Sequence, residues 1–279
     1  MTTAVASALA QAKALGLDRL DAHLLLAHHL GRDRAWLLAH GDSVLPPSVL
    51  SAFEADCQRR ADAVPMAYLL GQREFHGLML QLSPDVLVPR PDTEILVDWA
   101  LHLLVGDLAV VSTPEVLDLG TGSGAIALAL KHSLPRARLS ASDASAAALE
   151  VARGNARAHR LEVEFRAGDW WLPWGERRFD LVVSNPPYIA ADDGHLTALR
   201  HEPAMALSPG ADALAAVDRI IEQAAAHLRE GAWLLIEHGN DQAHRVRQRL
   251  REAGFTAVQT RADLSGHDRC SAGHLARRD

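Results

Sequence analysis

Cysteine is scarce in this sequence, and its scarcity excludes whole classes of protein. The 279 residues include 2 cysteines, Cys57 and Cys270, which lie far apart and form no CxxC or zinc-like spacing. A secreted domain held together by disulfides would need more cysteines than this. We therefore expect two free thiols in a reducing compartment, which places the protein in the cytoplasm.

Long apolar runs, blocks of positive charge and metal-binding motifs are also missing. No stretch approaches the ~18–20 apolar residues of a membrane span, and the first residues show no secretory signal pattern. The formal net charge of −7, without a Lys/Arg-rich block, disfavours a protein that grips long nucleic acid through many phosphates. The 15 histidines are scattered and form no HExxH motif, so we expect no metal. We expect a monomer without a membrane or direct nucleic-acid partner.

The residues that are present indicate a globular protein in three parts. Hydrophobic residues make up 48% and charged residues 23%, and the length allows one or two cores. Residues 1–71 show helical spacing, which predicts a small N-terminal helical domain for partner recognition. Residues 72–88 predict a β-hairpin linker that turns at Gly77. Residues 89–279 predict a larger α/β domain.

The larger domain alternates strand and helix patterns from Glu115 onward. Such alternation predicts a Rossmann-like, mostly parallel sheet with helices on both faces. The expected strands are Val116–Leu119, Arg138–Ser142, Val163–Ala167, Leu181–Ser184, Trp233–Glu237, Phe255–Thr260 and Cys270–Ala276. The expected helices are Ile95–Leu104, Gly124–His132, Ala144–Ala158, Ala213–Arg229 and Gln242–Ala253. Asp92 or Thr93 can cap the first of them, and the short final connection predicts one antiparallel strand in a closing hairpin.

Asn185-Pro186-Pro187-Tyr188 follows the fourth expected strand, at the strand end where open α/β sheets bind ligands. A planar nitrogen is a poor nucleophile because its lone pair is delocalised. The Asn185 oxygen and a nearby backbone carbonyl can accept both N–H protons, which holds the NH2 group still and returns electron density to nitrogen. The prolines stiffen the loop and bring no competing N–H, and Tyr188 can pack on a flat substrate group. Alternatively, Asn185 is a simple turn residue.

A glycine-rich turn, Asp118-Leu119-Gly120-Thr121-Gly122-Ser123-Gly124, ends the first expected strand and opens a helix. Glycines let a backbone turn tightly and approach a ligand closely. Gly120, Gly122 and Ala125 also fit the G-x-G-x-x-A dinucleotide fingerprint. The turn alone therefore predicts an adenosine-containing ligand, or a tight turn with no ligand.

Residues at the next two strand ends extend this nucleotide-like site. Asp143 can accept hydrogen bonds from ribose hydroxyls, unless it only caps the following helix. Trp170 can stack on an adenine ring and Asp169 can meet its amino group. Trp170 can equally belong to the core with its neighbours Trp171 and Trp174.

NAD and S-adenosylmethionine fit these pieces about equally well. The loop at Asn185 favours S-adenosylmethionine, because hydride transfer has no use for an amide clamp. Methyl transfer to a planar nitrogen does need one, since nitrogen, methyl carbon and sulfur must lie in line. Neither a metal nor a strong base is needed, because the sulfonium is a strong electrophile and the proton becomes acidic once the nitrogen is methylated.

Taken together, the motifs resemble those of the HemK/PrmC family, the glutamine methyltransferases of peptide chain release factors. The motifs that carry the resemblance are Pro65 to Gly71, Arg73-Glu74-Phe75, Leu87 to Glu94, the glycine-rich turn, Asp143, Gly168-Asp169-Trp170, Asn185 to Ile189, Glu202-Pro203 and Ala206-Leu207. Asn-Pro-Pro-Tyr also occurs in DNA amino-methyltransferases, but its combination with Pro-Arg-Pro-Asp-Thr-Glu and a helical N-terminal domain is specific. Ala213 departs from the usual family glycine and affects only a local turn.

The resemblance implies a fold, a cofactor and an acceptor. The fold is a class I S-adenosylmethionine-dependent methyltransferase with a seven-stranded sheet, preceded by a helical bundle. The implied cofactor contacts are Gly120, Thr121, Gly122, Ser123, Gly124, Asp143, Trp170 and Asn185. The implied acceptor is the GGQ glutamine of class I release factors, bound by Asn185, Pro186, Pro187 and Tyr188. Catalysis would fall to Asn185, Pro186 and Tyr188.

Three other functions compete with this interpretation. A methyltransferase for exocyclic amines of DNA or RNA shares the Asn-Pro-Pro-Tyr motif, but the acidic charge and the lack of a recognisable target-recognition domain disfavour it. An NAD-dependent oxidoreductase shares the glycine-rich turn. An inactive binding module would retain the cofactor pocket, but the intact Asn-Pro-Pro-Tyr sequence argues against it.

Overall fold

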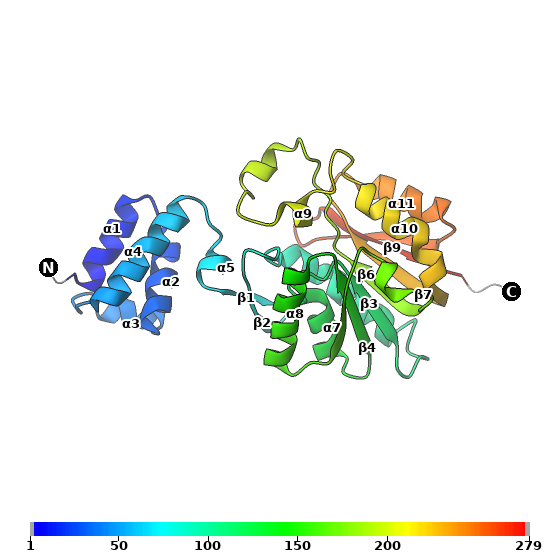
Figure 1. Ribbon diagram of the computed structural model, residues 1–279, viewed down its shortest axis with the longest axis horizontal. Helices are drawn as coiled ribbons and strands as arrows, with labels where there is room; N and C mark the ends of the chain where they lie inside the picture. Colours follow the sequence, from blue (N-terminus) through cyan, green and yellow to red (C-terminus); the bar gives the residue numbers. More distant parts are fainter. Residues whose placement is uncertain (1–2, 277–279) are drawn as a thin grey trace. The chain divides into compact units, whose positions relative to one another are not determined.

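A computed structural model describes residues 3–276 of the chain (Figure 1). By its internal contacts the chain divides into two compact units, Met1–Gln72 and Arg73–Asp279. The first two residues of the expected helical domain and the last three of the expected α/β domain lie outside the described residues. The domain bounds expected from the sequence stay a prediction. Within residues 3–276, no helix is both long enough and apolar enough to cross a membrane.

The first unit is a bundle of short helices around one apolar core. Its helices are α1 (Val5–Ala14), α2 (Arg19–Leu30), α3 (Arg34–Ala39), α4 (Pro47–Ala61) and α5 (Met66–Leu69). Gly31 ends α2 in the left-handed conformation, with φ of 62°. Asp33 starts α3, because its Oδ1 accepts a hydrogen bond from Trp36 N at 2.7 Å. Buried side chains such as Phe53 and the free thiol Cys57 fill the space between the helices.

A two-stranded hairpin opens the second unit. Its strands are β1 (Gln72–Phe75) and β2 (Leu78–Gln81), and both residues of the turn, His76 and Gly77, have positive φ. The buried side chain of Asn155 ties β2 to the rest of the unit. It bonds Gln81 N at 2.7 Å and Gln81 O at 3.0 Å, and its Nδ2 also donates to Ser123 O at 2.9 Å. The Asn155 side chain therefore links the hairpin to the glycine-rich turn.

A seven-stranded sheet forms the body of the second unit, with strand order β5-β4-β3-β6-β7-β9-β8. Its strands are β3 (Glu115–Leu119), β4 (Arg138–Asp143), β5 (Val163–Ala167), β6 (Phe179–Ser184), β7 (Leu228–Glu237), β8 (Thr256–Ala262) and β9 (Asp268–His274). The helices are α6 (Glu94–Val105), α7 (Ala125–Ser133), α8 (Ala146–His159), α9 (Ala204–Leu207), α10 (Ala215–His227) and α11 (Ala243–Glu252), with short 3-10 turns η1 (Pro91–Thr93), η2 (Leu172–Trp174) and η3 (Gly194–Thr197). Only β9 runs antiparallel to its neighbours.

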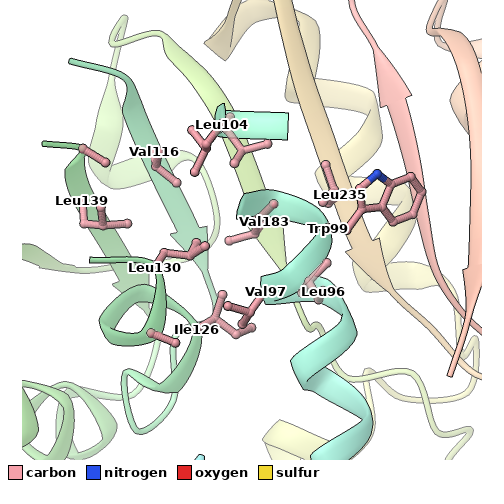
Figure 2. Packing of buried hydrophobic residues seen from close by; sticks show 14 of the residues in the cluster. Leu96, Val97, Trp99, Leu104, Val116, Ile126, Leu130, Leu139, Val183 and Leu235 are labelled. Carbon is pink, nitrogen blue, oxygen red and sulfur yellow. The ribbon is translucent and has the colours of Figure 1, made fainter. Parts of the chain in front are cut away.

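Two apolar cores cover the two faces of this sheet, because successive strand side chains point to opposite faces. On β6, Val183 packs under α6 and α7, as Figure 2 shows, whereas Val182 faces the core beneath α10 and α11. On β7, Leu235 and Leu234 divide between the same two cores. The carboxyl ends of the central strands are thereby fixed in space by packing on both sides.

The predicted fold class is confirmed, including the single antiparallel strand. Element ends differ by a few residues from the predicted ones. β7 begins at Leu228 and not at Trp233, because the chain passes straight from α10 into the strand. α8 begins at Ala146 and not at Ala144, because Ser145 is its N-cap.

Candidate active site

Neighbouring strand ends bring the predicted site residues to one edge of the sheet. β3, β4, β6 and β7 are parallel, and their registers align the last residues of each strand. The residues at or just after these ends are Gly120, Asp143, Asn185 and Glu237. They therefore lie near one another at the carboxyl edge, where open α/β sheets bind ligands.

A buried aspartate holds the glycine-rich turn in shape. Thr121 Oγ1 donates to Asp118 Oδ2 at 2.6 Å, and Ala127 N donates to the same oxygen at 3.3 Å. Burial raises the pKa of the Asp118 carboxyl to about 7, against the lowering effect of these two hydrogen bonds. The Thr121 side chain therefore faces inward and links the turn to α7.

Only part of the turn faces open space. Gly120 and Gly122 line a cavity, whereas Ser123 and Gly124 are buried. Gly124 has a φ of 86°, and a Cβ built there would lie 3.2 Å from Ala152 Cβ. A glycine at this position lets α7 and α8 pack closely behind the turn.

Asp143 faces the same cavity and supports the turn with its carboxylate. Asp143 Oδ2 accepts from Gly122 N at 2.8 Å, and its Oδ1 accepts from Ser145 N at 2.9 Å. The alternative that Asp143 only caps the next helix is wrong, because Ser145 Oγ accepts from Ala148 N at 3.1 Å and caps α8. Burial raises the pKa of Asp143, and the two backbone hydrogen bonds oppose the rise. Each oxygen retains a lone pair for a ligand hydroxyl.

Trp170 lies on the cavity wall, whereas its neighbour Trp171 is a core residue that is 1% exposed. The ring of Trp170 lies across the turn, 3.4 Å from where a Cβ would stand at Gly120. Asp169 lines the cavity too, and its Oδ2 accepts from Arg219 Nη2 at 2.6 Å. The cavity thus combines an aromatic face, a carboxylate and bare glycine backbone.

Two further segments, which the sequence does not predict to bind a ligand, complete the wall of this cavity. Its volume is about 340 Å³. They are residues 84–87, which precede η1, and residues 203–206 around α9. Leu87 and Pro203 lie within the motifs that carry the family resemblance. Nothing in their spacing along the chain indicates that they share a wall, since that contact is tertiary.

A second cavity, also of about 340 Å³, adjoins the first and is lined by the whole Asn-Pro-Pro-Tyr loop. Asp92, Leu199 and Leu207 complete parts of its wall. The residues that line both cavities are Leu87, Asn185, Pro187 and Ala206. Asn185 therefore lies where the two cavities meet.

An ion pair between the half-buried Arg90 and the buried Glu202 connects the segments that line both cavities. The Glu202 side chain is 2% exposed, and its Oε1 accepts from Arg90 Nη2 at 2.5 Å. Its Oε2 accepts from Val88 N at 3.1 Å. These contacts fix the segment before η1 against the segment before α9, and so hold Leu87 and Ala206 in place.

The Asn-Pro-Pro-Tyr loop is anchored by buried polar groups. Asn185 Nδ2 donates to Thr93 Oγ1 at 3.2 Å, and Tyr188 Oη donates to Glu237 Oε1 at 3.3 Å. Gln242 Nε2 donates to the backbone oxygen of Tyr188 at 2.9 Å. Burial raises the pKa of Glu237 to about 7, and burial together with Glu237 raises the pKa of the Tyr188 phenol. Tyr188 therefore stays protonated at neutral pH.

The predicted capping of α6 by Asp92 or Thr93 is wrong. Thr93 occupies the N-cap position of α6, but its side chain accepts no hydrogen bond from that helix. Its hydroxyl is used instead by Asn185, 92 residues further along the chain. Asp92 lies 3.6 Å from Arg269, measured from Oδ2 to Nη2. Among residues 3–276, no group of three or more histidine, cysteine, aspartate or glutamate side chains could hold a metal ion.

Comparison with known proteins finds relatives along most of the chain. Residues 94–263 match the methyltransferase small domain family, and residues 2–71 match the PrmC N-terminal domain. The chain is 51% identical over 264 residues to the release factor glutamine methyltransferase of Bordetella pertussis, covering 93% of this chain and 96% of the relative. It is 49% identical over 260 residues to the protein of the same name from Xylella fastidiosa, covering 92% and 93%.

Solved structures share the fold at low sequence identity. The hMettl16 catalytic domain in complex with an RNA hairpin has a TM-score of 0.58 and 17% identity, with 85% of each chain covered. The 16S rRNA N2 G1207 methyltransferase of T. thermophilus in complex with AdoMet and guanosine has a TM-score of 0.55 and 22% identity, with 74% of this chain and 50% of that chain covered. These likenesses show the class I methyltransferase fold. The sequence identities are far higher and span both units, so the chain belongs to the release factor glutamine methyltransferase family.

Proposed function

We propose that this protein transfers a methyl group from S-adenosylmethionine to the side-chain amide nitrogen of the glutamine in the GGQ motif of class I peptide chain release factors. The observation that carries the proposal is the position of Asn185, which lines both cavities. A methyl donor in one cavity and an amide in the other would meet at this side chain.

The first cavity has the lining that S-adenosylmethionine requires. Gly120 and Gly122 present backbone without side chains, Asp143 offers carboxylate lone pairs to ribose hydroxyls, and Trp170 offers an aromatic face to adenine. Its volume of about 340 Å³ is in the range of small-molecule sites. When bound, the cofactor supplies an electrophilic methyl carbon attached to a sulfonium. Thr121, Ser123 and Gly124 complete the turn that we propose to bind the cofactor, and all three are buried.

Asn185 and Pro186 activate the acceptor by holding it. The Oδ1 of Asn185 and the backbone oxygen of Pro186 accept the two N–H protons of the glutamine amide, which fixes the plane of the NH2 group. Accepting both protons also returns electron density to a nitrogen whose lone pair is otherwise delocalised. Pro187 keeps the loop stiff, and the ring of Tyr188 packs on the flat amide.

The residues around the acceptor hold the amide in place, and they need not deprotonate it before methyl transfer. The nitrogen proton becomes acidic only after the new N–C bond has formed, and it then leaves to solvent. The raised pKa of Tyr188 keeps its phenol neutral, so it serves as a packing and hydrogen-bonding group and not as a base. The proposed catalytic residues are therefore Asn185, Pro186 and Tyr188.

The helical domain, residues 1–71, is proposed to recognise the release factor, with residues 72–88 as a hairpin linker and residues 89–279 as the methyltransferase domain. We propose a cytoplasmic monomer that acts on protein and makes no direct contact with nucleic acid. The formal net charge of −7 supports a protein substrate over a polyanion.

The test is methyl transfer with purified components. The full chain is mixed with S-adenosylmethionine and a class I release factor, and the peptide that contains the GGQ motif is analysed by mass spectrometry. We expect one added methyl group on the glutamine side chain. Parallel reactions with DNA and RNA should show no transfer of label from the cofactor. Label in nucleic acid, with none in the release factor, would contradict the proposal.

A further inference from the structure

The side chain of Thr93 contacts the proposed catalytic residue Asn185 and lies near the buried carboxylate of Glu237. Thr93 is 4% exposed, and its Oγ1 accepts from Asn185 Nδ2 at 3.2 Å. Glu237 is fully buried at the end of β7 and lies close enough to the Thr93 hydroxyl for that hydroxyl to lower the pKa of its carboxyl. Since Thr93 does not cap α6, a role in starting that helix does not account for its hydroxyl.

A hydroxyl carries a single proton, and this fixes how the Asn185 amide is turned. An ionised Glu237 only accepts hydrogen bonds, so the Thr93 proton points toward it. Glu237 Oε2 has no close hydrogen-bond partner in the described part of the chain, so the carboxylate has acceptor capacity left for that proton. Thr93 then offers Asn185 a lone pair, and Asn185 must turn its NH2 group toward Thr93 and its Oδ1 away from it.

We propose that Thr93 and Glu237 are positioning residues that set the orientation of the Asn185 amide, so that its oxygen faces the acceptor. The opposite orientation would direct an NH2 group at the N–H protons of the substrate amide, which would repel it. Neither residue touches the reacting atoms. The inference rests on the proposed function, because only an N–H-bearing acceptor requires an oxygen at this point.

The charge of Glu237 controls this arrangement, and several groups face it. Arg269 of β9 favours its ionised form, whereas Asp92 of η1 opposes it. Tyr188 donates to its Oε1, and the thiol of Cys270 on β9 lies near enough to be affected by its charge. Both Tyr188 and Cys270 have pKa values raised above their ordinary range, so neither titrates near neutral pH.

Glu237 itself does titrate near neutral pH, because burial raises its pKa to about 7. Below that pH the carboxyl carries its own proton and no longer requires the proton of Thr93. The Thr93 hydroxyl is then free to donate to the Asn185 oxygen, and the side-chain amide of Asn185 rotates by about half a turn to place its oxygen toward Thr93. Turnover is therefore expected to fall as the pH drops through about 7 and to level off above it.

The amide orientation can be observed without measuring activity. The sequence contains three asparagines, Asn155, Asn185 and Asn240, so selective 15N-asparagine labelling gives three side-chain NH2 signals. The Asn185 signal is assigned by its loss in N185D. We expect it to shift as the pH falls through about 7 in the wild type and to show no such transition in E237Q. A signal that does not respond to pH, or that T93V leaves unchanged, would overturn the proposal.

Kinetics on the release factor provide the second test. T93V replaces the hydroxyl with a methyl group of similar size, and T93S keeps the hydroxyl and serves as the matched control. We expect T93V to lower kcat by about tenfold or more, with KM for both substrates changed less than about threefold and a cooperative urea transition retained. T93S should recover most of the activity, and E237Q should lose the acidic limb of the pH profile. Equal loss in T93V and T93S would show that the hydroxyl is not what matters.

The two proposals fail in different ways. If the wild-type chain leaves the GGQ glutamine unmodified, the proposed function fails, and the NMR titration still decides whether Thr93 and Glu237 orient Asn185. If the wild type is active and T93V is equally active, only the positioning role fails.

Discussion

Replacing Asn185 by alanine removes the oxygen that holds the acceptor amide and leaves the loop backbone in place. The two following prolines restrict φ, so the main chain should keep its path. Loss of one positioned polar group at a reacting centre costs about 2–4 kcal/mol of transition-state stabilisation. We therefore expect turnover to fall by about 30- to 1,000-fold.

Cofactor affinity should change much less in this variant. Asn185 contributes one side chain to a wall that also includes Gly120, Asp143 and Trp170. Loss of a single neutral hydrogen bond costs about 0.5–1.5 kcal/mol, or about 2- to 13-fold in Kd. The difference between the two losses is what identifies Asn185 as a group that acts on the transition state.

The assay pairs single-turnover methylation of a release factor with calorimetric binding of S-adenosylhomocysteine. Asn240→Ala is the matched control, because Asn240 is exposed and lies outside both cavities. Equal losses of turnover and affinity in Asn185→Ala would show that Asn185 mainly shapes the pocket. Such a result would refute the clamp.

Three further predictions follow from the same contacts. Asp143→Ala should weaken S-adenosylhomocysteine binding by about 1.5–3 kcal/mol, since hydrogen bonds to a charged group are lost; an unchanged Kd in calorimetry would rule out ribose binding by Asp143. Gly124→Ala should lower the free energy of unfolding in urea by about 1–3 kcal/mol, because φ is 86° and the new Cβ would lie 3.2 Å from Ala152. Gly122→Ala, with φ of 55° and no atom within 4 Å, should cost less, and equal costs would contradict the packing argument. Burial raises the pKa of Glu237 from 4.5 to about 7, so the folded state keeps a proton that the unfolded state loses, and stability should fall as the pH rises through this window. Glu237→Gln should reduce that slope in urea titrations from pH 4 to 8, and an unaltered slope would show that Glu237 does not cause it.

Local sequence patterns were enough to predict the sheet. Leu181–Val183 and Trp233–Ile236 are continuous apolar runs, which is the pattern of parallel strands buried on both faces. The short final connection predicted the antiparallel β9 for an equally local reason. The ends of the elements were less predictable. The start of β7 at Leu228 depends on how α10 joins that strand, and the start of α8 at Ala146 depends on whether Asp143 or Ser145 caps the helix.

The sequence predicts which strand-end residues lie together at one edge of the sheet, but not the contacts that residues make at long range. Gly120, Asp143 and Asn185 meet because parallel strands end at one edge. Thr93 looked like a helix cap because the capping rule uses only its near neighbours, yet its hydroxyl contacts Asn185. Local sequence patterns do not predict the pairing of Glu202 with Arg90 either, since 112 residues separate them.

A structure of the chain with S-adenosylhomocysteine and a release-factor domain that carries the GGQ loop tests the central claim most directly. We expect the glutamine side-chain nitrogen to lie within hydrogen-bond distance of both Asn185 Oδ1 and the Pro186 backbone oxygen, facing the cofactor sulfur. A glutamine bound elsewhere, or with its nitrogen turned away from Asn185, would contradict the amide clamp.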